Sequence, residues 1–491
     1  MVSWYNLNVV GCCLLGGCSG LMSYNLEPFE DLPSEELSEL SELSAPPAQL
    51  GLWHSEEEAV EEERVCSELY PEPSGEAFYV DPVHGDDGNA GTSDAPWASL
   101  QVVVDQYVDC TDQYGTPRHS SAPVKGGDRI VLRGAVGYEE PLQIKSCYNE
   151  EMVHIVSEVH REPRIGSVRV KGAGFWSFEG LTMSAEGGQV FKAEGYDSIG
   201  FSHHIRVHDN AITSGELETW SDYSERASTA VKLSRADHVD VTCNRMERIA
   251  GAVSVQGNYV DVLYNYVELF SRDAFVNSGS HNRYIGNRVY DSVKLNDGHH
   301  DDFFQSHSGV YPDTATEIVV AYNVFMNRYT DAQPEETHGP TQCIGAFGEG
   351  PRTHWSVYNN VCKTDHWHGI TVKEAYDSKV VNNTVVGGGA FPGGIWSGWS
   401  TETSWISVSG GGNVVRNNLT SKNSSGGDHN IVVEPGDVYD LFVDWEGGDL
   451  RLKPDSDAVD AGTKDSAPED DVRGTLRDER PDAGAYELAT D

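Results

Sequence analysis

The side chains best suited to acid–base or metal chemistry crowd into one short segment. Residues 297–307 hold three His, three Asp and one Gln, namely Asp297, His299, His300, Asp301, Asp302, Gln305 and His307. Another carboxylate, Asp273, precedes them. Two carboxylates held close together either bind a cation or share a proton, and imidazole exchanges protons near neutral pH. The segment predicts a catalytic or metal site, with Asp273 and Asp302 as ligands of a candidate Ca²⁺ ion. The alternative is that these side chains only bond to turns and to one another.

A recurrent Asn indicates the elements that must position these residues. It precedes β-branched or apolar residues at Asn244, Asn265, Asn287, Asn323, Asn360, Asn383 and Asn418, at successive spacings of 21, 22, 36, 37, 23 and 35. The long spacings are a unit of about 22 residues plus about 14 inserted ones. Short repeats with strand alternation and no helical stretch are typical of a solenoid of stacked parallel strands. A β-sandwich is the alternative, but it would leave a constant anchor residue at spacings of 21 to 23 unexplained.

Aligning the coils on their Asn anchors predicts which residues share a face. Fourteen residues before an anchor stand Gly251, Asp273 and Gly369, and ten before stand Val255, Asn277 and Lys373. Asp302 joins Asp273 if about half of an insertion precedes it. Their carboxylates would then lie about 4.8 Å apart, one strand spacing. Alternation along residues 370–373 predicts that Thr371 and Lys373 face solvent while the other two point inward.

The chain is strongly acidic. Its 78 Asp and Glu against 34 Lys and Arg give a formal charge of -44, of which residues 27–65 contribute -12 (13 acidic side chains, one Arg) and the rest -32. Recognition of phosphates needs clustered Lys and Arg, so the composition argues against a nucleic-acid partner. The simplest interpretation of the charge is a solvated, self-repelling surface, which also suits a salty environment.

The first residues are expected to direct export. Residues 1–17 carry no charge, include the apolar run 9–15, and end in Leu15-Gly16-Gly17 before Cys18, which resembles the lipobox of bacterial lipoprotein signals. No Lys or Arg precedes Cys18, so an ordinary signal peptide or a misassigned start stays open. We expect a signal at 1–18 and a disordered acidic tether at 19–65, with a weak helix as the alternative for the tether. The protein would be periplasmic, secreted, or held at the outer membrane or cell surface by a lipid on Cys18. No run of 18 apolar residues occurs, so no membrane-spanning helix is predicted.

Six cysteines follow the leader: Cys66, Cys110, Cys147, Cys243, Cys343 and Cys362. Their even number and the absence of CxxC pairs predict up to three disulfides in an exported protein. We expect Cys110 to pair with Cys147 and Cys343 with Cys362. Buried free thiols are the alternative.

Three segments together resemble one known superfamily. They are the entry (Phe78-Tyr79-Val80-Asp81 and Gly127-Asp128-Arg129-Ile130-Val131-Leu132), the Asn-anchored coils, and the exit (Leu450-Arg451-Leu452-Lys453-Pro454 and Asp482-Ala483-Gly484-Ala485-Tyr486-Glu487). They cover most of residues 76–488 and are similar to the right-handed parallel β-helix superfamily, in its secreted bacterial branch with pectate lyases, alginate lyases and mannuronan C5-epimerases. The resemblance implies a monomeric right-handed β-helix with a cap and first coils at 66–164, a core at 165–445, and a closing strand and tail at 446–491.

The resemblance also implies an acidic polysaccharide laid along one outer sheet. Elimination beside a uronate carboxylate needs a base and a positive charge that neutralises the carboxylate. The catalytic residues would be His300, Asp302 and Lys373, with His300 or Lys373 as base. Further contacts to substrate would come from Arg272 as the neutralising group and from Gln305, His307, His368 and Lys232. Other basic or aromatic candidates are Lys294, Arg352, His366, Trp367, Trp396, Trp399 and Trp405.

The leading expectation is therefore a uronate polysaccharide lyase, with three alternatives. A C5-epimerase would perform the same proton abstraction, although Asp297-Gly298-His299 has Gly where the epimerase motif has Pro. A glycoside hydrolase would use Asp273, Asp301 and Asp302 as acid and base. A surface glycan-binding or adhesive protein would hold the polymer without turnover.

Overall fold

The computed structural model describes residues 65–488, apart from 296, 308–314, 330–332, 334, 349, 365, 388, 391–399, 402–403, 424 and 435. The chain divides into two compact units between residues 44 and 45, and every described residue belongs to the second unit. The expected signal at 1–18 and nearly all of the expected tether at 19–65 lie outside the described residues, as do Trp396 and Trp399.

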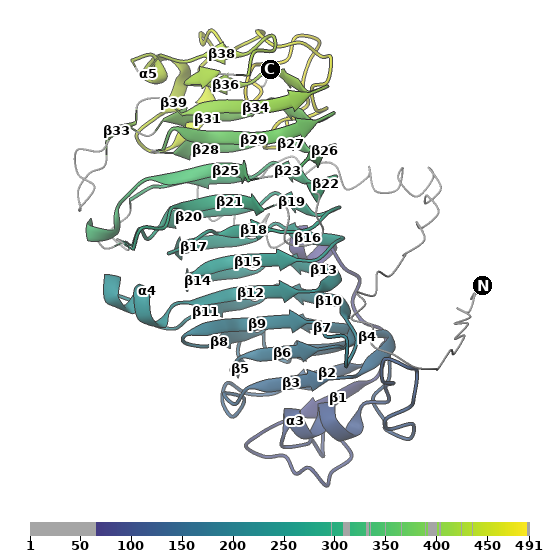
Figure 1. The fold of residues 1–491 in the computed structure, drawn as a ribbon. Coiled ribbons are helices and arrows are strands. Elements are labelled where there is room, and N and C mark those ends of the chain that lie inside the picture. Colours follow the sequence, from purple (N-terminus) through teal and green to yellow (C-terminus); the bar gives the residue numbers. More distant parts are fainter. Residues whose placement is uncertain are drawn as a thin grey trace, which may run out of the picture. The chain divides into compact units, whose positions relative to one another are not determined.

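Over the described residues the chain winds into a parallel β-helix with three long sheets (Figure 1). The first sheet consists, in spatial order, of β1 (Ala77–Val80), β2 (Arg129–Leu132), β4 (Tyr148–Ser157), β7 (Gly174–Glu179), β10 (Ser202–His208), β13 (Ala236–Thr242), β16 (Val260–Leu263), β19 (Arg283–Ile285), β23 (Val319–Ala321), β27 (Ser356–Tyr358), β30 (Lys379–Val381) and β35 (Val414–Arg416). The second consists of β5 (Arg164–Ile165), β8 (Thr182–Ser184), β11 (Ala211–Thr213), β14 (Arg245–Ile249), β17 (Tyr266–Phe270), β20 (Arg288–Ser292), β24 (Val324–Met326), β28 (Val361–Thr364), β31 (Thr384–Gly387), β36 (Leu419–Thr420) and β38 (Ile431–Val432).

The third sheet, called the site sheet below, consists of β3 (Leu142–Lys145), β6 (Val168–Lys171), β9 (Gly188–Glu194), β12 (Ser228–Ser234), β15 (Gly251–Gln256), β18 (Phe275–Asn277), β21 (Asp301–His307), β25 (Thr341–Phe347), β29 (His368–Tyr376), β34 (Trp405–Gly411) and β37 (Lys422–Asn423), with β22 (Ala315–Thr316) and β26 (Arg352–Thr353) at one edge. Short antiparallel pairs join β32 (Gly389–Ala390) to β33 (Ser400–Thr401) and β39 (Phe442–Asp444) to β40 (Asp449–Leu452). Because crossovers between parallel strands are right-handed in nearly all proteins, this is the right-handed parallel β-helix that the sequence predicts.

A ladder of buried Asn side chains holds successive coils in register. The Oδ1 of Asn265 accepts hydrogen bonds from the backbone N–H and Nδ2 of Asn244, both at 3.0 Å, and its own Nδ2 donates to Oδ1 of Asn287 at 3.0 Å. The same contact links Asn210, Asn244, Asn265, Asn287, Asn323, Asn360, Asn383, Asn418 and Asn430. The left-handed residue of each turn is the one before the Asn, with φ of 59° at Cys243 and 55° at Tyr264. The Asn therefore acts through its amide bonds, while the residue before it takes the left-handed geometry of the turn.

Apolar side chains stack coil upon coil inside the solenoid. On the site sheet, Phe275, Phe304, Ile344 and Ile370 occupy matching positions of four neighbouring strands, and each is 0% exposed. Burial of such columns from water is the main favourable term for a solenoid of this kind. The residues that follow these positions along their strands, among them Gln305, Gly345 and Thr371, align in the same register, so the register of the core also fixes that of the outer surface.

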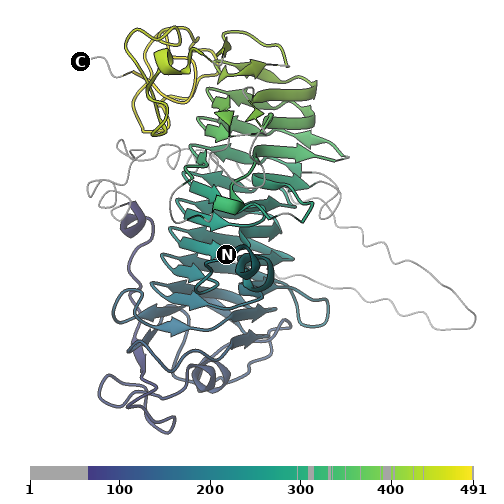
Figure 2. The same ribbon diagram turned by 90° about the vertical axis from the view of Figure 1, so that its left-hand side faces the viewer.

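Helical segments cover the first coils and one face of the second sheet. At the first coils, α3 (Leu100–Val102) continues into the π-helix η2 (Val103–Tyr107), whose Val103 and Val104 join the main core. At the other end, α5 (Val438–Leu441) and the segment that follows it pack on the second sheet, in one cluster with Tyr266 and Val324 (Figure 2). Two further helices, α4 (Trp220–Arg226) and η3 (Glu335–Thr337), belong to insertions between coils.

Three disulfides tie the described chain. The expected pairs Cys110–Cys147 and Cys343–Cys362 are confirmed, and the third bond joins Cys66 to Cys243 across 177 residues. Disulfides persist in oxidising compartments, so the bonds indicate an extracytoplasmic protein. Within the described ranges, no helix has the length and apolar character needed to cross a bilayer.

Candidate functional site

The outward face of the site sheet presents side chains in registered columns. Column one contains Asp273, Asp302, Gln342, His368 and Trp405, by continuation of the pairing along β18, β21, β25, β29 and β34. Column two contains Gln305, Gly345 and Thr371, and column three contains His307, Phe347 and Lys373. Neighbouring members of a column are about 4.8 Å apart along the stack, the spacing of paired strands. The observed register therefore confirms the expected alignment of Asp273 with Asp302.

Asp273, His300 and Asp302 form the candidate site. The backbone N–H of Asp302 donates to Oδ1 of Asp273 at 3.1 Å, which fixes that carboxylate against the neighbouring coil. Nδ1 of His300 lies 3.1 Å from Oδ2 of Asp302, and the two side chains are 54% and 0% exposed. Neither oxygen of Asp302 accepts a hydrogen bond of good geometry from the described residues. Asp302 is thus a fully buried carboxylate whose close ionic neighbour is an exposed imidazole.

Burial governs protonation at this site. Desolvation, with the nearby Asp302 and Asp301 second, raises the pKa of Asp273 to about 7. Desolvation also raises the pKa of Asp302, opposed by His300. The Asp302 carboxylate in turn raises the pKa of His300 above its ordinary value. A buried carboxyl whose pKa is raised to about 7 beside an imidazole whose pKa is also raised is typical of a functional site rather than of a solvated surface.

Contacts of Asp301 with Ser292 and Lys294, not with the candidate site, hold the inserted loop before β21. The Asp301 carboxylate accepts a hydrogen bond from Ser292 Oγ at 3.0 Å and lies 3.3 Å from Nζ of Lys294. All of these groups are buried, and desolvation raises the pKa of Asp301 to about 6. On the outer side of the loop, Arg272 pairs with Asp297 at 3.0 Å. Asp301 therefore anchors the loop, while Arg272 stays partly exposed beside Asp273.

A second group of side chains lies two coils beyond Asp302. Nδ1 of His368 lies 3.2 Å from Thr371 Oγ1, and its ring meets the rings of Phe347 and Trp405 edge-on at 5.0 Å each. Nζ of Lys373 lies 5.5 Å from the centroid of the Phe347 ring. Desolvation lowers the pKa of His368 to about 4. This group combines a neutral imidazole, a cation and aromatic rings on one part of the outer face.

The structure separates the residues predicted to act together. His300 and Asp302 are in contact, but Lys373 lies two coils away against Phe347. The predicted alignment of Lys373 with Asn277 is wrong by one residue, because Asn277 matches Ser306, Ala346 and Val372 through the observed pairing. A register shift between Val372 and Ala375, where β29 pairs β34 out of step and Glu374 has a φ of 53°, lies in the stretch over which the count was made.

Other predicted positions differ in exposure. Ile370 and Val372 point inward as predicted, but Thr371 is 1% exposed, because His368 and Trp405 cover it. Gln305 is nearly buried and His307 is exposed on the same strand. Lys232 lies in column two, three strands before Gln305. Arg352 is buried and donates to the backbone oxygens of Gly350 and Lys373, so it supports the fold.

Gln342 and Phe347 are site-face residues that the sequence did not reveal. Gln342 follows Asp302 in column one, and its Oε1 is buried without a hydrogen bond among the described residues. Both residues belong to a coil with a long insertion, where the distance from Asn323 no longer indicates the register. The sequence did hold one signal for Phe347: an aromatic residue two positions after Gly345 in a strand. In the structure the Phe347 ring lies over that glycine.

The three central residues also fit a metal ion. One ligand atom each from Asp273, His300 and Asp302 lies within 4.8 Å of the others. The two Asp302 oxygens that accept no hydrogen bond have the character of unused ligands. Two carboxylates alone suit Ca²⁺, which takes oxygen ligands, whereas the added imidazole suits Mn²⁺ or Zn²⁺. The structure thus extends the predicted ligand pair by His300.

No protein-family model and no curated protein matches the chain. Among solved structures it is similar to pectate lyase Pel9A (16% identity, 84% of this chain and 96% of that chain, TM-score 0.41). It is also similar to the GH136 lacto-N-biosidase from Eubacterium ramulus (13%, 73% and 69%, TM-score 0.43) and to PfbA, a surface adhesin of Streptococcus pneumoniae (8%, 62% and 79%, TM-score 0.37). At these identities and TM-scores the likenesses say nothing about the activity of this chain.

Proposed function

We propose that the protein is a lyase that cleaves an acidic, uronate-containing polysaccharide by β-elimination, with His300 as the base. The observation that supports this most is the exposed His300 imidazole backed at Nδ1 by the buried Asp302 carboxylate. A carboxylate in that position favours the tautomer with its proton on Nδ1, which leaves the Nε2 lone pair for the substrate. A base whose pKa lies near the working pH is the most effective one.

The reaction places one demand on each neighbouring group. His300 Nε2 would take the proton from the sugar carbon beside the carboxylate, the bond to the leaving oxygen would break, and a carbon–carbon double bond would form. The leaving oxygen would gain its proton from solvent. Arg272, partly exposed next to Asp273, would exchange Asp297 for the substrate carboxylate and stabilise the negative charge that develops there. His368, Phe347 and Lys373 would hold the adjoining sugars.

Hydrolysis by paired carboxylates has weaker support. Such a reaction needs two carboxyl groups flanking the glycosidic bond, at about 5–5.5 Å or about 6.5–9.5 Å from each other. Asp301 is buried against Ser292 and Lys294, and Asp302 has no exposed surface. Asp273 is then the one accessible carboxylate of the three, so the alternative lacks its second catalytic group. The C5-epimerase remains an alternative, because it uses the same base.

A divalent ion at Asp273 and Asp302 would supply positive charge for the substrate carboxylate. Ligation by carboxylates alone leaves His300 free as base, whereas ligation through the imidazole removes it. Activity that survives a chelator and keeps the pH dependence of His300 supports the base. Activity that disappears with the chelator and returns with Ca²⁺, Mn²⁺ or Zn²⁺ supports the ion.

The test is the ultraviolet absorbance of unsaturated uronate during incubation with alginate, polygalacturonate and other uronate polymers. We expect a rise with at least one polymer and a fall in rate of about 10²–10⁴ in His300→Ala, the range for loss of a general base. His299→Ala is the matched control, because His299 is an exposed neighbour outside the Asp273–His300–Asp302 group. Equal activity of the two variants would contradict the role of His300.

A further inference from the structure

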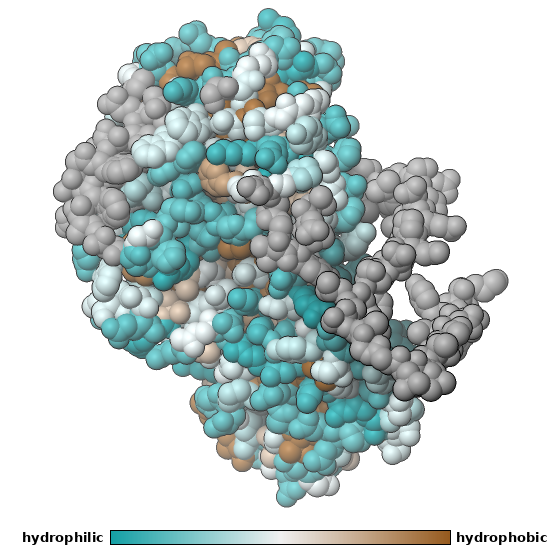
Figure 3. Space-filling view, viewed as in Figure 1, coloured by the Kyte–Doolittle hydropathy of each residue, from teal (hydrophilic) through white to brown (hydrophobic). Residues whose placement is uncertain are grey.

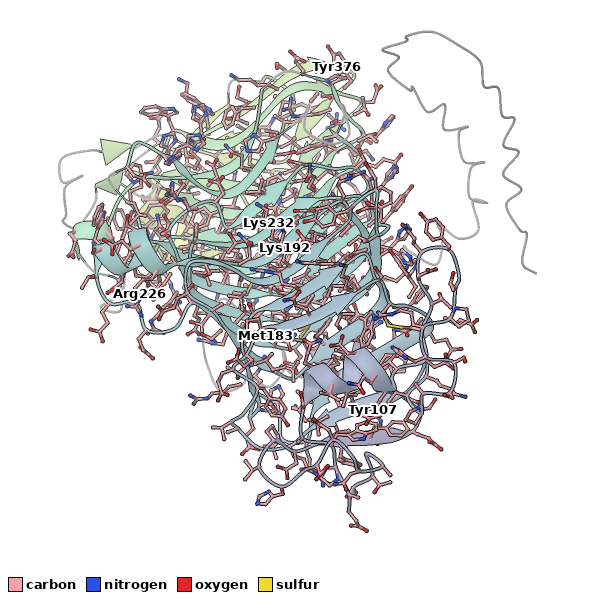
Figure 4. All side chains as sticks on the ribbon, turned by 60° about the horizontal axis from the view of Figure 1, so that its bottom comes forward. Tyr107, Met183, Lys192, Arg226, Lys232 and Tyr376 are labelled. Atoms are coloured by element: carbon pink, nitrogen blue, oxygen red, sulfur yellow. A yellow bond between two sulfur atoms is a disulfide. The ribbon has the colours of Figure 1, made fainter. Side chains whose placement is uncertain are left out.

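The first coils of the site sheet carry a concentration of positive charge that the candidate site does not use. Pairing of β3, β6, β9 and β12 aligns Gln143, Arg169, Lys192 and Lys232 in column two, and Lys145, Lys171 and Glu194 in column three. Figure 4 shows Lys192 and Lys232 side by side on this sheet. Counting these outward positions gives five cations against one carboxylate, a net +4, on a chain of net charge -44.

Ion pairing within the fold does not account for this charge. Glu194 pairs with Lys192 and lies 3.7 Å from Lys171. In the part of the chain that the structure describes, no carboxylate lies within ion-pair distance of Lys145, Arg169 or Lys232. Like charges at directly opposed positions, about 4.8 Å apart, destabilise a sheet. The free protein thus holds cations close together, and a bound polyanion would reduce the repulsion between them.

The position of the patch indicates which polyanion. Column two continues from Lys232 through Ser254 and Val276 to Gln305, three strands or about 14 Å away. The patch therefore lies on the same outer face as His300 and Asp302 and in line with it. None of the outward residues named on these four strands is aromatic, whereas single-stranded nucleic acid is bound by stacking its bases on aromatic rings.

We infer that Lys145, Arg169, Lys171, Lys192 and Lys232 form a second binding site, which holds the anionic groups of the same polysaccharide before it reaches the candidate site. The inference rests on the proposed function for the identity of the polymer, and it adds that the polymer must be charged over several consecutive units. A neutral glycan would leave these cations unneutralised. Binding at this patch can be measured without turnover.

The test is calorimetric titration of the purified protein with polygalacturonate and alginate, at two salt concentrations, with dextran as the neutral polymer. In the double variant Lys192→Gln/Lys232→Gln we expect the Kd to rise about tenfold or more, since each lost charged hydrogen bond weakens binding severalfold. The binding should also become less sensitive to salt. Lys379→Gln, which removes an exposed charge from β30 of the first sheet, is the matched control and should bind as the unaltered protein does.

Several results would overturn the inference. One is an unchanged Kd in the double variant, and another is no binding of any anionic polymer by the unaltered protein. Tighter binding of oligodeoxythymidylate than of polyuronates would assign the patch to nucleic acid. Failure of the proposed function looks different: no polymer would yield unsaturated product, yet the double variant would still lose binding. If both ideas hold, the double variant raises KM with little change in kcat, while His300→Ala lowers kcat and keeps binding.

Discussion

At the scale of single residues, Asp302 is held where a carboxylate is poorly solvated, with the His300 imidazole as its close neighbour. Its burial is complete, and its oxygens accept no hydrogen bond of good geometry from the described residues. A buried carboxylate in such a position costs several kcal/mol unless a cation compensates it. The arrangement is therefore unfavourable for folding alone and is explained by a role in setting the state of His300.

The pH dependence of the reaction tests that role. Asp302 raises the pKa of His300, and a base must be unprotonated to act, so activity should rise with pH through a value above the ordinary 6.5. Asp302→Asn removes the negative charge, so we expect the acidic limb of the kcat/KM profile to move to lower pH while the maximum rate falls. A profile with an unmoved acidic limb would show that another group is the base.

The raised pKa of Asp273 makes the stability of the folded protein depend on pH. Burial raises its pKa from 3.8 to about 7, so the folded protein holds a proton that the unfolded chain has released over this window. Stability should therefore fall as pH rises from about 4 to about 7. Asp273→Asn removes this loss, and we expect it to be more stable than the unaltered protein at pH 8 by roughly 1–3 kcal/mol, with little difference at pH 4.

The measurement is urea unfolding at both pH values in the presence of a chelator, because a bound cation would stabilise the charged carboxylates. A variant that is equally destabilised at pH 4 and pH 8 would contradict the raised pKa. Asp297→Asn is the control, because Asp297 is an exposed carboxylate at the edge of the same site.

At the scale of elements, the Asn ladder is the feature that the sequence predicts best. One residue type, repeated after about 22 residues or after about 22 plus an insertion, identifies the turn, and the turn identifies the coil. Asp273 could be placed because the coil from Asn265 to Asn287 has no insertion, whereas the placement of Asp302 needed an assumption about the insertion in its own coil. Lys373 and Gln342 could not, because inserted residues and a local irregularity in β29 change the count without leaving a sign in the sequence. The alignment of these two residues follows from the strand pairing in the structure.

The ladder should also bear on stability. Asn265 takes part in hydrogen bonds with Asn244, Asn287 and the oxygen of Val241, all buried. Asn265→Ala leaves several buried groups without partners, so we expect a loss of about 3 kcal/mol or more. Chemical unfolding followed by circular dichroism measures it. Asn430→Ala, at the half-buried end of the ladder, should cost clearly less, and equal losses would contradict a cooperative ladder.

At the scale of the whole molecule, charge is distributed unevenly. Hydrophilic residues predominate among the coloured residues on the face that Figure 3 shows. Net charge is -44 for the chain, yet the first coils of the site sheet are positive. Composition alone suggested only a solvated acidic surface, because the cations that matter are far apart in sequence and meet through strand pairing. The positive patch therefore could not be found without the register.

Such an acidic molecule should be stabilised by salt. Screening weakens the repulsion among carboxylates, so we expect the thermal midpoint to rise as NaCl increases from about 0.05 M to about 0.5 M. KCl should act equally, since the effect is one of ionic strength. A midpoint that is flat or falls with salt would show that specific ion pairs outweigh the general repulsion.

The central claim is elimination at His300, and the masses of the product ends test it most directly. Oligosaccharides released from the interior of the polymer should carry an unsaturated non-reducing end and be lighter by one water than the corresponding hydrolysis products, and His300→Ala should release none above background. Saturated ends of full mass would show hydrolysis and contradict the account.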